Sequence, residues 1–211
     1  MKTSELVALL ATGAGPAPRA VVARRLLPVV LAGGALSAAL AIGVLGLVPE
    51  RMLAGQALWT KIAYSAALML AAGWLASRLA RPAAPTGAAW RWVAAVVAVM
   101  VLAALAALAT MPGAERLRSL LGHSWSICPW TVLALSLPAL AGTLWALRGL
   151  APTRPRAAGA AAGLLAGAAG ACGYAWACTE ESTVFVAAWY TLGIGLTAAL
   201  GALLGPRALR W

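Results

Sequence analysis

Aspartate is absent from this 211-residue chain, and acidic residues as a whole are scarce. Only 5 acidic residues, all glutamates, stand against 16 lysines and arginines, and charged residues make up 10% of the sequence. Soluble domains carry about a quarter charged residues, so a chain this poor in charge needs a solvent other than water. Hydrophobic residues make up 63% and the mean hydropathy is +0.90, which indicates an integral membrane protein.

Enzyme signatures are missing as well. The single histidine, His123, has no aspartate to complete a Ser-His-Asp triad, and neither a phosphate-binding G-x-x-x-x-G-K loop nor an H-E-x-x-H zinc motif occurs. The net charge of +11 is distributed between apolar runs and is not gathered on a soluble module. We therefore expect no enzymatic activity, no resident cofactor and no direct binding of nucleic acid.

Six apolar stretches reach the length of about 20 residues that a helix needs to cross a bilayer. Pro, Gly and charged residues separate them, as expected of loops. Backbone groups must be satisfied without water, so helices are expected throughout. The sequence predicts an all-α polytopic bundle (residues 26–211) after a soluble N-terminal segment (1–25), with spans at 26–48, 57–79, 91–111, 128–148, 157–178 and 184–204.

The distribution of lysine and arginine predicts the orientation, because cytoplasmic loops carry an excess of both. With both termini in the cytoplasm, 12 basic residues fall on the inner side: Lys2, Arg19, Arg24, Arg25, Arg78, Arg81, Arg91, Arg148, Arg154, Arg156, Arg207 and Arg210. The outer side keeps Arg51, Lys61, Arg116 and Arg118 with four of the glutamates. Lys61, near the start of the second span, is expected to extend its ammonium to the membrane surface.

Glycines recur every four residues in the fifth span, at Gly159, Gly163 and Gly167. Gly201 and Gly205 repeat this spacing at the end of the last span. This spacing places small residues on one helix face and lets two helices approach closely. Packing within the bundle is the favoured interpretation over dimerisation, and the oligomeric state stays open.

Two of the three cysteines are expected at the outer membrane face. Cys128 begins the fourth span and Cys178 ends the fifth, whereas Cys172 is expected about 9 Å deeper, inside the bundle. Spacing alone leaves three alternatives: inert cysteines, a disulfide, or a thiol-based metal site. Additional metal donors would be His123, Glu180 and Glu181, although their spacing matches no standard zinc pattern.

The N-terminal segment predicts a short helix over residues 1–10, with Leu6, Leu9 and Leu10 on one face, followed by a Gly- and Pro-containing tether. A helix this short is marginal alone in water. It therefore either docks into a groove of a partner or lies on the membrane surface.

Several segments resemble the NrsF-type family of bacterial membrane anti-sigma factors. They are the opening Met1-Lys2-Thr3-x-Glu5-Leu6, the pair Cys128-Pro129, the ending Gly205-Pro206-x-x-Leu209-Arg210-Trp211, and a long stretch around Cys178. That stretch, the most specific, runs Tyr174-Ala-Trp-Ala-Cys178-Thr-Glu180-Glu181-x-x-x-Phe185-x-x-x-Trp189-Tyr190-x-Leu-Gly193-Ile194.

The resemblance implies a bacterial inner-membrane protein that holds an extracytoplasmic-function sigma factor and releases it under heavy-metal or oxidative stress. Cys128 and Cys178 would be the sensing pair, with a heavy-metal ion bound only transiently, and Cys172 would be structural. The sigma-factor contact would be carried by Lys2, Thr3, Glu5, Leu6, Leu9 and Leu10. A small transporter or channel is the alternative function, which the scarcity of charge inside the spans disfavours; a membrane chaperone is a third.

Overall fold

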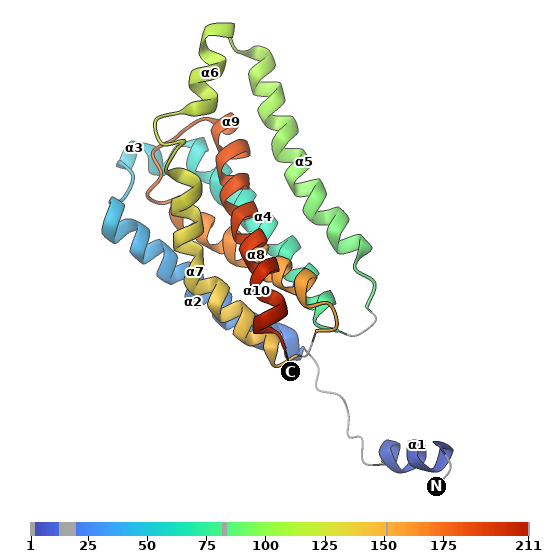
Figure 1. The fold of residues 1–211 in the computed structure, drawn as a ribbon. Coiled ribbons are helices and arrows are strands. Elements are labelled where there is room, and N and C mark those ends of the chain that lie inside the picture. The colour runs from blue at the N-terminus through green and yellow to red at the C-terminus, as the bar shows by residue number, and fades with distance from the viewer. Residues whose placement is uncertain (1–2, 13–19, 82–83, 151, 211) are drawn as a thin grey trace.

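The computed structural model describes residues 3–12, 20–81, 84–150 and 152–210. Within these ranges it is all-helical, which confirms the predicted fold class, and six helical segments are long and apolar enough to cross a membrane. They are α2 (Val21–Leu45), α4 (Gln56–Leu79), α5 (Gly87–Thr110), α7 (Cys128–Arg148), α8 (Pro155–Tyr174) and the composite segment Thr183–Ala208. Figure 1 shows them side by side in one bundle.

Five short elements complete the described part of the fold. Helix α1 (Thr3–Thr12) stands apart from the bundle, and α3 (Glu50–Leu53) and α6 (Gly113–Leu121) lie in connections between spans (Figure 1). The last span begins as α9 (Thr183–Phe185), passes through one π-helical turn, η1 (Val186–Tyr190), and continues as α10 (Thr191–Ala208). Such π turns within a helix often mark functional sites.

Helix α8 is the centre of the bundle and packs against α2, α4, α7 and α10. Its glycines meet α10 at backbone distance: a Cβ atom at Gly159 would collide with the carbonyl of Gly201, and one at Gly163 with the carbonyl of Thr197. Gly167 approaches the backbone of Ile194 in the same way. The glycine pattern therefore serves packing within the bundle, as the sequence favoured.

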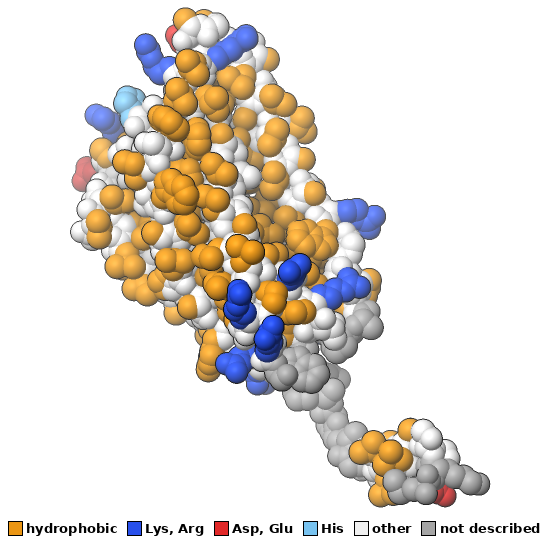
Figure 2. All heavy atoms as spheres, viewed as in Figure 1, with side chains coloured by type: hydrophobic (Ala, Val, Ile, Leu, Met, Phe, Trp, Pro, Cys, Tyr) orange, Lys and Arg blue, Asp and Glu red, His pale blue; other side chains and the backbone are white. Residues whose placement is uncertain are grey.

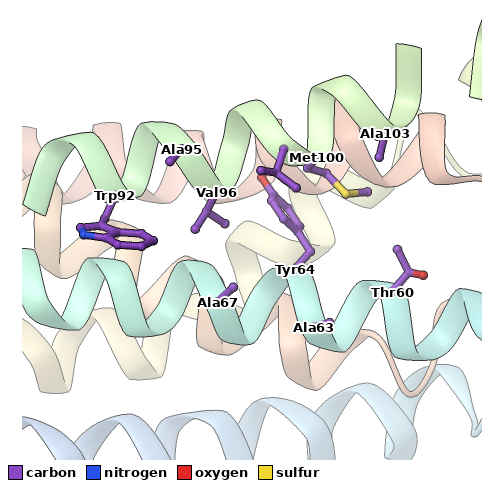
Figure 3. A pocket seen from close by; sticks show the side chains of 10 residues that line it. Thr60, Ala63, Tyr64, Ala67, Trp92, Ala95, Val96, Met100 and Ala103 are labelled. Atoms are coloured by element: carbon purple, nitrogen blue, oxygen red, sulfur yellow. The ribbon is translucent and has the colours of Figure 1, made fainter. Parts of the chain in front are cut away.

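Helix α5 is the most peripheral span and rests mainly on α4 and on the start of the last span. An apolar groove of about 450 Å³ separates α4 from α5. Figure 3 shows Trp92, Val96 and Met100 of α5 facing Tyr64 of α4 across it. The Tyr64 hydroxyl is 2.7 Å from Oγ1 of Thr191, which joins α4 to α10.

Several predicted boundaries shift, and two of these shifts have a clear cause. Helix α2 begins at Val21, not at residue 26, because Arg24 and Arg25 continue the helix beyond the apolar run. Helix α8 ends at Tyr174, not at residue 178, because the chain turns over 175–177 and the Trp176 carbonyl accepts a hydrogen bond from Val48 at 3.0 Å. Cys178 consequently lies in the connection after α8.

The two ends of the bundle differ in charge. The end at which α4, α7 and α10 finish carries most of the arginines, and we call it the arginine end: Arg24, Arg25, Arg78, Arg81, Arg148, Arg154, Arg156, Arg207 and Arg210. In Figure 2 the basic side chains gather there, beside the C-terminus. The opposite end, which we call the cysteine end, holds α3, α6, α9, Cys128 and Cys178.

Candidate functional site

The structure brings Cys128 and Cys178 together at the cysteine end, where they are buried and unbonded. Cys128 is the first residue of α7, and its amide donates to the Ser124 carbonyl at 2.8 Å. The Cys178 amide donates to the carbonyl of Tyr174 at 3.0 Å, which fixes the turn that follows α8. The two thiols are close enough to interact electrostatically.

Two tyrosines enclose this thiol pair. The Tyr174 side chain, at the end of α8, contacts both thiols. Tyr190, the last residue of the π turn, is fully buried, with its ring centroid 5.8 Å from that of Tyr174. Its hydroxyl approaches Cys178 but makes no hydrogen bond of regular geometry. The π turn thus aims a polar group without a partner at the cysteines.

Lys61 is the cation of the site, and its predicted extension to the membrane surface is wrong. The side chain is only 2% exposed, and Nζ donates a hydrogen bond to the Cys178 carbonyl at 2.5 Å. The ammonium also lies near Cys128. Lys61 turns inward because the chain after α8 offers a buried acceptor within its reach. One signal is visible in the sequence, since Lys61 is the one charged residue of α4 apart from Arg78 in its last turn.

Glu180 is the anion of the site and holds the loop before Cys128. Its Oε1 atom accepts hydrogen bonds from the amide of His123 at 2.7 Å, the amide of Ser124 at 2.9 Å and the hydroxyl of Ser124 at 3.0 Å. The loop approaches so closely because Gly122 has φ 56°, and a Cβ atom there would meet the Glu180 carboxylate and Phe185. Glu180 therefore positions the loop that leads into α7.

The other suggested metal donors are not assembled around the cysteines. His123 is exposed and contributes its backbone amide to Glu180, and Glu181 is also exposed. Among the residues that the structure describes, no three His, Cys, Asp or Glu side chains are grouped to hold a metal ion. What the site offers is a pair of thiols, a donor type suited to soft metal ions and to disulfide formation.

Cys172 lies apart from this pair and is half-buried, which corrects the expectation that it would be enclosed in the bundle. It lines a cavity of about 190 Å³ together with Gly34 of α2 and Trp176. Small residues of α2 and α8, Ala35 and Gly173 among them, form part of its wall.

Further contacts fasten the Cys178 connection to α6, an element that the sequence analysis did not predict. The Ser182 hydroxyl is 2.7 Å from that of Ser119 and accepts a hydrogen bond from the amide of Phe185 at 3.3 Å. The indole of Trp189 donates to the Leu120 carbonyl at 2.8 Å, and its ring lies at a tilt of 47° to that of Trp125, with the centroids 5.5 Å apart. The connection that leads into Cys128 and the connection that contains Cys178 are thus both tied to the start of the last span.

Helix α1 is the second candidate region. All ten of its residues are exposed, including Leu6 (43%), Leu9 (66%) and Leu10 (68%). Val7, which lies outside the predicted leucine face, is also 60% exposed. Thr3 and Glu5 lie in its first turn, and Lys2 is outside the described residues. The structure has a helix at Thr3–Thr12, and its leucines stay uncovered by the bundle.

Comparison with known proteins places the whole chain in one family. Residues 10–211 match the NrsF family, described as "Negative regulator of sigma F". The chain is 38% identical over 220 residues to the probable anti-sigma-F factor NrsF of Azospira oryzae, and 36% identical over 214 residues to the anti-sigma-F factor NrsF of Caulobacter vibrioides. Each alignment covers 100% of both chains. No solved structure matches it significantly. The chain therefore belongs to the NrsF family of negative regulators of sigma F, as the sequence resemblance indicated.

Proposed function

We propose that this protein is a membrane anti-sigma factor that binds an extracytoplasmic-function sigma factor through α1 and releases it when Cys128 and Cys178 react with a heavy metal or an oxidant. The full-length relation to two proteins named anti-sigma-F factors supports the regulatory role. The observation that carries the mechanism is the buried pair of thiols at one end of the bundle, with the exposed leucines of α1 as the docking element.

The leucines of α1 favour a protein partner. A ten-residue helix is marginal alone in water, and burial of each leucine on a partner contributes about 1.5–3 kcal/mol. An amphipathic helix docks in this way into an apolar groove of another protein. Thr3, Glu5 and Lys2, next to the leucines in sequence, would supply the polar edge of the contact.

The charge of the two bundle ends supports a cytoplasmic arginine end. Positively charged loops stay on the cytoplasmic side of a bacterial inner membrane, and the chain that leads from α1 enters the bundle at this end, through α2. In this orientation α1 faces the compartment that contains sigma factors. The cysteine end then faces the oxidising extracytoplasmic space, where signals arrive first.

Reaction at the thiols would change the packing of the cysteine end. Oxidation forms an S–S bond between Cys128 and Cys178 and passes two electrons to the oxidant, with release of two protons. A soft metal ion would instead displace the thiol protons and bind both sulfurs. Because Lys61, Tyr174, Tyr190 and Glu180 pack around the pair, either event biases the bundle between two packings.

The docking role of α1 is tested by capture of the sigma factor on the full-length protein in detergent. Replacing Leu6, Leu9 and Leu10 together with alanine keeps helix propensity but removes the apolar contact, and we expect affinity to fall at least about 100-fold. The matched control replaces Ser4 and Thr12, exposed polar residues of the same helix, with alanine. Unchanged affinity of the leucine variant would assign the contact to another segment.

A further inference from the structure

A second polar site lies at the arginine end, far along the bundle from the cysteines. A cavity of about 410 Å³ opens where α4 ends and α5 and α8 begin. Three arginines line it, Arg78 in the last turn of α4, Arg81 just after that helix and Arg154 just before α8, together with Thr86 and Thr153. The described lining contains no acidic residue, so the positive charge within the cavity is not neutralised there.

One nitrogen in this wall lacks a partner. The Nε atom of Arg78 is buried and makes no hydrogen bond. A guanidinium is a rigid fork of donors, and buried donors in native proteins are normally satisfied. An oxygen-rich anion in the cavity would supply the acceptor that the described residues do not.

The start of α5 adds to the positive field. Gly87, the first residue of this helix, is part of the wall, and the Thr86 side chain makes no capping hydrogen bond. The first amides of a helix lack acceptors within it and, with the helix dipole, attract anions. Three arginines and an uncapped helix start therefore converge on one cavity.

We propose that this cavity binds a phosphate group, and that the phosphate belongs to the head group of an anionic phospholipid. Arginine binds phosphate through two parallel hydrogen bonds. The end of α4 and the start of α5 mark the level at which the chain leaves the apolar part of the membrane, and head-group phosphates lie at this level. Basic pockets between membrane helices bind anionic lipid head groups in this manner, and the volume suits a small ligand.

The test is titration of the full-length protein, in a neutral detergent, with phosphatidylglycerol or phosphatidylcholine under native mass spectrometry. We expect phosphatidylglycerol to bind wild type at least about tenfold more tightly than phosphatidylcholine, and Arg78→Gln and Arg154→Gln each to weaken its binding about tenfold. Arg207→Gln, which removes the same charge at the same end but outside the cavity, should bind as wild type does.

Competition by inorganic phosphate distinguishes the sources of the anion. If millimolar inorganic phosphate displaces phosphatidylglycerol from wild type, the cavity takes the free anion also; if phosphatidylglycerol stays bound, the lipid is the ligand. Arg154 is exposed, so its replacement leaves the fold intact. Wild-type affinity in Arg154→Gln, or an equal loss in Arg207→Gln, would overturn the proposal. Sigma-factor capture plays no part in this test.

Discussion

The ammonium of Lys61 donates a hydrogen bond to the backbone carbonyl of Cys178 from a position that is only 2% exposed. A residue at the start of α4 thereby fixes the connection between α8 and the last span, 117 positions along the chain. The bond explains why a charged side chain is retained inside the bundle: it anchors the segment that carries one of the two thiols.

Lys61→Met should release this anchor. Hydrogen bonds to charged groups contribute about 1.5–3 kcal/mol. In a background where Cys128 and Cys172 are serine, we therefore expect a maleimide to alkylate Cys178 at least about tenfold faster in Lys61→Met than in the protein that retains Lys61. Thr60→Ala is the matched control, because Thr60 bonds only the Gln56 carbonyl of its own helix. An unchanged alkylation rate would show that the Lys61 contact does not restrain the connection.

Gly122→Ala should lower the stability of the protein by more than the cost of placing alanine at a positive φ angle. A non-glycine residue in this region of backbone space costs about 1–3 kcal/mol, and the new methyl group would also meet the Glu180 carboxylate and Phe185. Gly46→Ala separates the two effects, since Gly46 also has positive φ, 86°, but open space around it. Thermal midpoints in detergent should therefore fall further for Gly122→Ala; equal losses would argue against the close approach.

Glu180→Ala should loosen the loop that leads into Cys128. Three hydrogen bonds to one carboxylate oxygen are lost and two part-buried amides are left without this acceptor, so we expect a loss of about 2–4 kcal/mol in unfolding free energy. Glu181→Ala, the exposed neighbour, should leave the thermal midpoint unchanged. A larger effect of Glu181→Ala than of Glu180→Ala would contradict the positioning role.

Gly163→Ala and Gly195→Ala should have opposite effects on stability. The methyl group at Gly163 would collide with the Thr197 carbonyl and force α8 and α10 apart, which costs about 1–3 kcal/mol. At Gly195, on α10 with no neighbour within 4 Å, alanine should stabilise the helix by about 0.5–1 kcal/mol. Thermal unfolding in detergent checks both signs, and a stabilising Gly163→Ala would refute the tight α8–α10 contact.

The sequence predicted those features that depend on apolar length and glycine spacing. Six spans and close packing of the glycine faces within the bundle follow from local patterns, although the pairing of α8 with α10 was not predicted, and the resemblance of the Cys178 stretch identified the family. The partners of Lys61 and Glu180 were not predictable, because each bonds to an acceptor or donor supplied by a distant connection. The amphipathic α6 and the end of α8 at Tyr174 were also missed, since short polar helices and hydrogen-bonded turns leave little trace in hydropathy.

The most direct test of the central claim is capture of the sigma factor on detergent-solubilised wild type and on a Cys128→Ser, Cys178→Ser variant, each with and without cadmium or an oxidant. We expect both proteins to bind the sigma factor at rest, and only wild type to release it on treatment. Equal release from the variant, or retention by treated wild type, would contradict a sensing role for the two thiols. Failure of any sigma factor to bind either protein would contradict the anti-sigma function itself.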